Sequence, residues 1–180
     1  MGQDKAQLEV DGVPMAARVA DALRAAGADE VWAVGGDPVG LRLAGLEVVP
    51  DDVPGGGPLP ATLTALEHAT QSLVVVLSCD LVHPSPSAVA TVLEALHRAP
   101  GALAAVPVVG GHHQWTQAAW RVGAREALRA AQTGGATSLR RAAVALNIAD
   151  VPGIDPVHVL DADTPEDLIA ALRRTPTTGR

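Results

Sequence analysis

A run of five consecutive apolar residues, Leu73 to Leu77, constrains the fold of this chain more than any other feature. Its sequence is LVVVL, in which β-branched valines predominate. An uninterrupted apolar run of this kind is typical of a strand that is covered on both faces, as in a sheet between two layers of helices. The run leads directly into Ser78, Cys79 and Asp80, so a carboxylate is expected where this strand ends.

Helices and strands are expected to alternate along the rest of the chain. Apolar residues at helical spacing, ended by Gly or Pro, predict helices over 14–26, 61–70, 86–98, 125–131 and 138–145. Short apolar runs predict further strands over 30–35, 46–49, 102–107, 114–122 and 157–160. Thr164 and Asp167 have the spacing of a capping box at the start of a last helix. This alternation indicates a three-layer, Rossmann-like α/β fold with a mostly parallel sheet.

Composition and charge limit the classes of protein to which the chain can belong. Its 180 residues, 48% of them hydrophobic, indicate one domain over 1–173, followed by a flexible tail at 174–180. A formal charge of -7 argues against a nucleic-acid partner, which needs a basic face. The one cysteine, Cys79, leaves no internal disulfide. No apolar run reaches the roughly 18 residues of a membrane span, so we expect a cytoplasmic protein with no membrane partner.

Acidic residues follow several of the predicted strands. Ligands of open α/β sheets bind beyond the carboxyl ends of the strands, where Asp51, Asp52, Asp80, Asp161 and Asp163 are expected. Mg²⁺ is usually held by one or two carboxylates together with substrate phosphates and water. Aspartate is also a common turn residue, and we prefer that interpretation for Asp52, Asp161 and Asp163. Asp80 ends the most apolar strand, so we predict a functional carboxylate there.

Three other features have both a functional and a structural interpretation. The loop Gly55–Gly57 allows a ligand close to the backbone, and the next helix could offer its amino end to an anion, although such loops are often only turns. His112 and His113 lie in a Gly-Gly turn and would point to opposite faces, so a solvated turn is expected rather than a metal site. Cys79 is expected to be a small buried filler.

Lys5 is the only lysine of the chain, and every other cationic side chain is arginine. A compact ammonium and a planar guanidinium are not interchangeable in a binding site. A lysine that persists in such a chain therefore indicates a position where arginine would not serve.

Several short motifs together resemble the molybdenum cofactor guanylyltransferase family of nucleotidyltransferases. The resemblance covers most of the chain and keeps the order of the family's motifs. These motifs are Met1-Gly2-Gln3-Asp4-Lys5-Ala6 with Leu8, Asp11-Gly12-Val13-Pro14-Met15, Val48-Val49-Pro50-Asp51, Gly57-Pro58-Leu59, Cys79-Asp80 and Thr164-Pro165-Glu166-Asp167-Leu168.

The resemblance implies a fold of the nucleotide-diphospho-sugar transferase type. It implies that GMP is transferred from GTP to molybdopterin, with Mg²⁺ as cofactor and pyrophosphate released, to give a guanine dinucleotide cofactor for acceptor molybdoenzymes. Carried over to this sequence, Lys5 would contact the nucleotide phosphates and act in catalysis. Asp51 would lie against the guanine nucleotide, Gly57 would line the nucleotide loop, and Asp80 would hold Mg²⁺ and act in catalysis.

The chain departs from the family pattern in two places. Asp161 and Asp163 stand where the family has paired asparagines, so a pterin-contacting role does not transfer to them directly. The sequence also begins inside the family's first motif, so the first strand and its Gly-rich loop are missing; we expect a start assigned too late rather than a shortened sheet. A related CTP or sugar-nucleotide transferase and a non-catalytic nucleotide-binding remnant stay open as alternatives.

Overall fold

A computed structural model describes residues 6, 8–162 and 164–174. Lys5, Asp163 and all of the predicted tail except residue 174 lie outside the described residues. In chain order the elements are β1 (Glu9–Val10), β2 (Val13–Pro14), α1 (Met15–Ala25), β3 (Trp32–Val34), α2 (Pro38–Leu43), β4 (Glu47–Val49), α3 (Pro58–His68), β5 (Leu73–Leu77), α4 (Pro86–Arg98), β6 (Ala104–Val109), β7 (His112–His113), β8 (Gln117–Arg121), η2 (Val122–Ala124), α5 (Arg125–Thr133), α6 (Leu139–Ala142), η3 (Ala143–Ala145), β9 (Ile148–Val151), η4 (Pro156–Val159) and α7 (Pro165–Leu172).

The middle layer contains two separate groups of paired strands. Five strands form one sheet in the order β5-β8-β6-β7, with β9 pairing to the other edge of β6. β3 and β4 form a parallel pair of their own and are not joined to β5. The predicted three-layer α/β fold is confirmed, but the larger sheet is mixed rather than mostly parallel, because β8 runs antiparallel to both β5 and β6.

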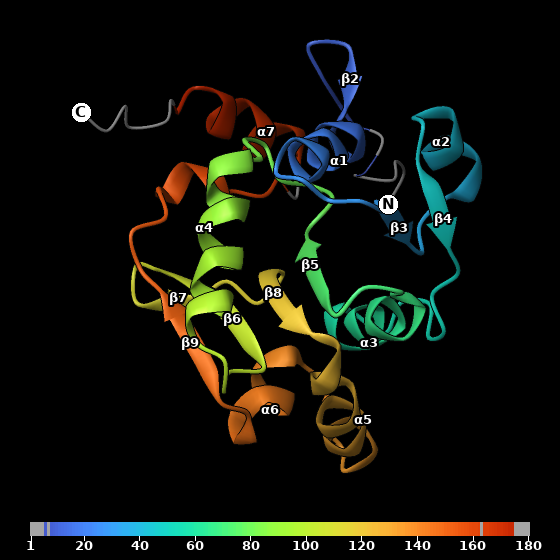
Figure 1. Ribbon diagram of the computed structural model, residues 1–180. Helices are drawn as coiled ribbons and strands as arrows, with labels where there is room; N and C mark the ends of the chain where they lie inside the picture. Colours follow the sequence, from blue (N-terminus) through green and yellow to red (C-terminus); the bar gives the residue numbers. More distant parts are fainter. Residues whose placement is uncertain (1–5, 7, 163, 175–180) are drawn as a thin grey trace.

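Helices cover both faces of this middle layer (Figure 1). α3, α5 and α6 pack on one face, around the buried Trp120 of β8 and Val106 of β6. On the other face α4 packs against the five-stranded sheet, whereas α1 and α2 pack against β3 and β4. β5 therefore lies between two helical layers, which explains why LVVVL is apolar without alternation.

Local sequence signals set several element ends. The helix predicted over 86–98 is α4, where Pro86 is the first residue and the Ser85 hydroxyl accepts the Ala88 N–H at 3.3 Å. The capping box at α7 is also confirmed, since Thr164 Oγ1 accepts the Asp167 N–H at 3.1 Å and Asp167 Oδ2 accepts the Thr164 N–H at 3.0 Å. Short side chains that satisfy free N–H groups at a helix start are thus readable from sequence.

The strand predicted over 157–160 is wrong. Residues Pro156–Val159 form the 3-10 turn η4, because Asp155 Oδ1 accepts the Val157 N–H at 3.0 Å and the proline at 156 favours a helical start. The sequence analysis did not predict α2, β9 or the small β1–β2 hairpin, which are all short. None of the described helices is long and apolar enough to cross a membrane.

Candidate functional site

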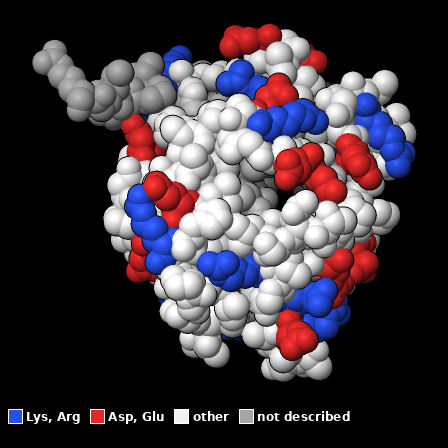
Figure 2. Space-filling view, viewed as in Figure 1, with Lys and Arg blue, Asp and Glu red and all other residues white. Residues whose placement is uncertain are grey.

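The candidate site is a cavity of about 410 Å³ at the carboxyl ends of β3 and β5. Gly35 and Gly36 line it from the end of β3, and Ser78 and Cys79 line it from the end of β5. The amino end of α3 borders it at Gly57 and Pro58. Figure 2 shows this face hollowed near its centre, with uncharged side chains around the opening and acidic side chains beside it. This position agrees with the general rule for ligand sites in α/β folds.

Asp51 is held against the end of β3. A Cβ atom added to Gly35 would lie 3.1 Å from Asp51 Cβ and 3.7 Å from its Oδ2, and Gly35 has a φ of +71°. Asp51 Oδ1 accepts the Val53 N–H at 3.0 Å, which fixes the side chain in a tight turn. The glycine thus lets the carboxylate approach the backbone that lines the cavity.

The glycine loop after Asp51 is packed closely onto α3. A Cβ atom on Gly56 would lie 2.7 Å from Pro60 Cγ and 2.9 Å from the Val53 carbonyl oxygen, so the loop has no room for a side chain there. Gly57 is the N-cap of α3, with a φ of +83°. Two of the first three helical residues, Pro58 and Pro60, have no N–H. The predicted anion site at this helix start therefore has fewer backbone donors than most helices offer.

Asp80 lies directly after β5 and is half-buried. The Ser78 hydroxyl donates a hydrogen bond to Asp80 Oδ1, which orients the carboxyl group. The Asp80 carbonyl oxygen accepts the Ala162 N–H at 3.2 Å, and Leu81 forms an antiparallel bridge with Asp161. These contacts bring the segment at Asp161 beside Asp80, although 80 residues of sequence separate them.

The structure brings three of the four predicted site residues to one region. Gly57 lines the cavity, Asp51 packs on Gly35 in its wall, and Asp80 follows the lining residues Ser78 and Cys79. Lys5, the fourth, lies outside the described residues.

Two minor predictions have different outcomes. Cys79 is exposed, so its prediction as a buried filler is wrong: it follows the end of β5, where the chain leaves the sheet. The histidines are exposed on β7, as expected for a solvated turn, and His113 Nε2 lies 2.8 Å from Asp150 Oδ1.

Three residues near the cavity had no role in the sequence analysis. Ser78 contacts the Asp80 carboxylate, Gly35 makes room for Asp51, and Thr116 lines the cavity. Ser78 precedes the Cys79-Asp80 motif, so its position at a strand end was an available signal. The other two become relevant only through contacts made across the fold.

Comparison with known proteins shows which family and which curated protein this chain is similar to. Residues 1–149 match the family described as "MobA-like NTP transferase domain". A curated protein of Pelotomaculum thermopropionicum, named "Probable molybdenum cofactor guanylyltransferase", is 40% identical over 114 residues. That match covers 63% of this chain and 54% of the relative, so it spans about half of the relative's length.

Solved structures share the fold at low sequence identity. The molybdopterin-guanine dinucleotide biosynthesis protein A of Archaeoglobus fulgidus has a TM-score of 0.73 and 20% identity, covering 94% of this chain and 89% of that one. A Mycobacterium tuberculosis protein solved in complex with manganese has a TM-score of 0.68 and 18% identity, covering 96% and 94%. At these identities the likeness concerns the fold alone.

Proposed function

This chain belongs to the family of MobA-like NTP transferase domains, and on that premise we propose that it transfers GMP from GTP to molybdopterin and releases pyrophosphate. The family assignment confirms the resemblance that the motifs indicated. The choice of GTP and molybdopterin is supported by the name of the 40% identical relative. We extend the proposal to a cytoplasmic location and to an acceptor molybdoenzyme that receives the dinucleotide product.

One observation carries this proposal. Gly57 lines a cavity at the carboxyl ends of β3 and β5, and the motif residues Asp51 and Asp80 contact Gly35 and Ser78, which also line it. A volume of about 410 Å³ lies within the range of small-molecule sites.

The residues around Asp80 fit a divalent cation that is held jointly with a nucleotide. Among the described residues no group of three or more His, Cys, Asp or Glu side chains could hold a metal. Mg²⁺ commonly takes only one or two protein carboxylates, and substrate phosphates and water complete its shell. Asp80, oriented by Ser78, would provide such a carboxylate. When bound, the metal would neutralise charge that develops on the phosphates.

The residues of the chain would mainly position the reactants. In the proposed reaction a phosphate oxygen of molybdopterin forms a bond to the α-phosphorus of GTP, and the bond from that phosphorus to the pyrophosphate oxygen breaks. We assign the phosphate contact to Lys5 and the nucleotide contact to Asp51, with the backbone at Gly57 close to the ligand. Phosphoryl-type transfer depends on such positioning and charge neutralisation more than on covalent catalysis.

The proposal is tested by incubating the protein with molybdopterin, Mg²⁺ and either GTP or CTP. Pyrophosphate release is measured together with the dinucleotide product. We expect product from GTP, and none when molybdopterin or Mg²⁺ is omitted. A faster reaction with CTP would favour the cytidylyl alternative, and nucleotide binding without any product would favour a non-catalytic binding protein.

A further inference from the structure

A late segment of the chain holds the residues that follow β5. Residues 158–162, named here the strap, run beside residues 80–83, which begin with Asp80. Hydrogen bonds join the two segments along their length, so the strap fixes the path of the chain after Asp80. The contacts are His158 Nδ1 to the His83 carbonyl oxygen at 3.0 Å, Val82 N–H to the Leu160 carbonyl oxygen at 3.0 Å, Ala162 N–H to the Asp80 carbonyl oxygen at 3.2 Å, and an antiparallel bridge between Leu81 and Asp161.

A buried glutamine ties the strap to the larger sheet. Gln117 is the first residue of β8, and only 7% of it is exposed. Its Nε2 donates to the Val159 carbonyl oxygen at 3.4 Å, near the start of the strap. The glutamine also lines a small cavity together with Leu81 and His158, which belong to the two joined segments. Gln117 therefore lies between the sheet, the strap and the residues after Asp80.

Gln117 and Asp80 leave the sheet from the same place. In the ladder between β5 and β8, Gln117 lies directly opposite Leu77, the last residue of β5. Asp80 follows Leu77 by three residues. The contacts thus close a ring that runs from Leu77 to Gln117, through the strap to Asp80, and back along the chain. Because the ring is closed, a loss of the bond at Gln117 frees the strap and with it Asp80.

The chemistry at position 117 differs from that of the rest of the strand. The next three residues of β8, Ala118, Ala119 and Trp120, are apolar and have no solvent exposure. A buried amide loses its hydrogen bonds to water, and the long bond to Val159 restores only part of that energy. Methionine has a similar length and would avoid this cost. What glutamine supplies here and methionine cannot is the hydrogen bond to the strap.

We propose that Gln117 is a positioning residue for Asp80: through the strap, it holds the carboxylate where a nucleotide-bound divalent cation needs it. The inference rests on the proposed function, in which Asp80 provides a carboxylate to that cation. Gln117 does not line the candidate site. It acts on the affinity for the cation, because a carboxylate that is correctly placed for only part of the time binds correspondingly more weakly.

Gln117→Met tests the proposal, since it keeps the length of the side chain and removes the donor. Electron paramagnetic resonance measures the binding of Mn²⁺ to the whole chain with the α,β-methylene analogue of GTP, which cannot be transferred. We expect the Kd of Mn²⁺ to rise about fivefold. In the transfer assay, the Mg²⁺ concentration at half-maximal rate should rise by a similar factor, whereas kcat at saturating Mg²⁺ should stay within about twofold of the parent.

Hydrogen exchange separates positioning from a general loss of structure. The amides of Val82 and Ala162, which join the strap to the residues after β5, should exchange about fivefold faster in Gln117→Met. The amides of β8 should keep their protection. A merely structural role would instead lower the melting temperature and quicken exchange throughout β5 and β8, without a change in the Mn²⁺ affinity.

Two further variants complete the test. Gln114→Met is the matched control: Gln114 Nε2 donates to the His112 carbonyl oxygen at 3.3 Å, a bond to β7 rather than to the strap, so the Mn²⁺ affinity should not change. His158→Leu removes the contact between the strap and the His83 carbonyl oxygen, so it should weaken Mn²⁺ binding as Gln117→Met does. This variant keeps the test decisive if Gln117→Met fails to fold.

Three results would overturn the proposal. These are an unchanged Mn²⁺ affinity in Gln117→Met and His158→Leu, an equal loss of affinity in Gln114→Met, and faster exchange that spreads over β5 and β8 without a change in affinity. If the parent binds no Mn²⁺ with the nucleotide analogue, the proposed function fails. Exchange at Val82 and Ala162 then still decides whether Gln117 holds the strap.

Discussion

β8 and β3 are both short apolar strands, yet they differ in how completely they are buried. β8 has β5 on one edge and β6 on the other, and its residues Ala118, Ala119 and Trp120 have no solvent exposure. β3 has a paired strand on one edge only, and all three of its residues remain half-buried. Burial of a strand in this fold therefore depends on neighbours along both edges as well as on helices above and below.

The two halves of the layer also differ in how tightly they are packed and in how close they lie to the candidate site. The centre of the five-stranded sheet, at β6 and β8, is fully buried, whereas the candidate site lies at the carboxyl ends of β3 and β5. Less complete packing leaves space for a ligand beside Gly35 and Ser78. We therefore expect stability and function to depend on different parts of one layer, and the following substitutions test that division.

The largest expected effect is on activity, from Asp80→Asn. The change keeps an oxygen that can accept from Ser78 but removes the charge needed for a cation, so transfer should fall about a thousandfold with little change in melting. Pyrophosphate release under saturating Mg-GTP is the measurement. Asp150→Asn in β9, an exposed partner of His113, is the control and should retain activity. Turnover of Asp80→Asn within a few-fold of the parent would contradict the assignment.

Lys5→Arg should impair nucleotide use almost as much as Lys5→Ala. A forked guanidinium does not replace a compact ammonium between phosphate oxygens, so we expect a loss of about a hundredfold for both variants. Transfer rates and GTP affinity are measured for each. An arginine variant that uses GTP like the parent would show that this lysine has no special role.

Paired tryptophan substitutions compare the two halves of the layer directly. Trp120→Ala empties a fully buried position and should lower the free energy of unfolding by about 3–5 kcal/mol. Trp32→Ala removes a half-buried ring whose centroid lies 5.1 Å from that of His68 and which borders a cavity. We therefore expect this variant to lower the free energy of unfolding by only about 1–2 kcal/mol. Urea unfolding provides both values. Equal losses would mean that β3 is packed as tightly as β8.

Gly56→Ala tests how closely the loop is packed on α3. The added Cβ would lie 2.7 Å from Pro60 Cγ and 2.9 Å from the Val53 carbonyl oxygen, which should cost about 1–3 kcal/mol. Gly101→Ala is a suitable control, because its Cβ would meet only Asn147 Nδ2, at 3.5 Å. Thermal melting of both variants is the measurement, and equal melting temperatures would refute the steric argument.

Sequence patterns identified the elements with strong local signals and missed those that depend on distant contacts. LVVVL predicted β5 with its correct bounds, and the helix predicted over 86–98 matches α4. The edge strand β9 is only four residues long, and it pairs with β6, which lies about 40 residues earlier in the chain. Likewise, the position of Asp80 was predictable from a strand end, whereas its approach to Asp161 depends on a bridge between distant segments.

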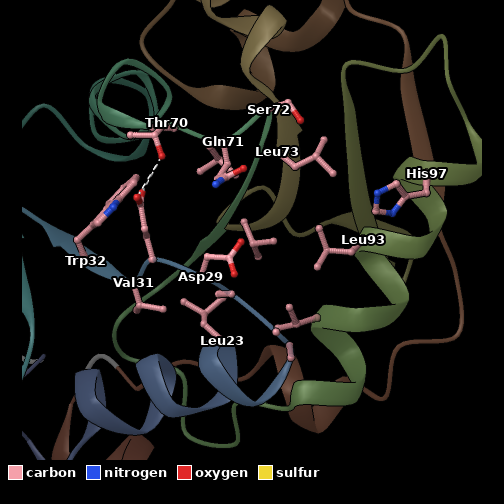
Figure 3. A pocket seen from close by; sticks show the side chains of 18 residues that line it. Leu23, Asp29, Val31, Trp32, Thr70, Gln71, Ser72, Leu73, Leu93 and His97 are labelled. Carbon is pink, nitrogen blue, oxygen red and sulfur yellow. Dashed lines mark hydrogen bonds between the residues drawn. The ribbon is translucent and has the colours of Figure 1, made fainter.

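The smallest expected effect comes from Thr70→Val, beside a cavity of about 390 Å³ at the amino ends of β3 and β5. Thr70 Oγ1 donates to the Glu30 carboxylate, with distances of 3.1 and 3.2 Å to its two oxygens, and so links the start of β3 to the segment before β5 (Figure 3). Valine keeps the shape of the side chain but removes the hydrogen-bond donor, so we expect the free energy of unfolding to fall by about 0.5–1.5 kcal/mol. Hydrogen exchange should quicken in β3 more than in β8, because β3 has a strand on only one edge. The control is Thr91→Val, which removes a hydrogen bond to the Ser87 carbonyl within α4 and should leave hydrogen exchange in β3 unchanged. If exchange in β3 quickens equally in both variants, the Glu30 contact does not hold the two halves of the layer together.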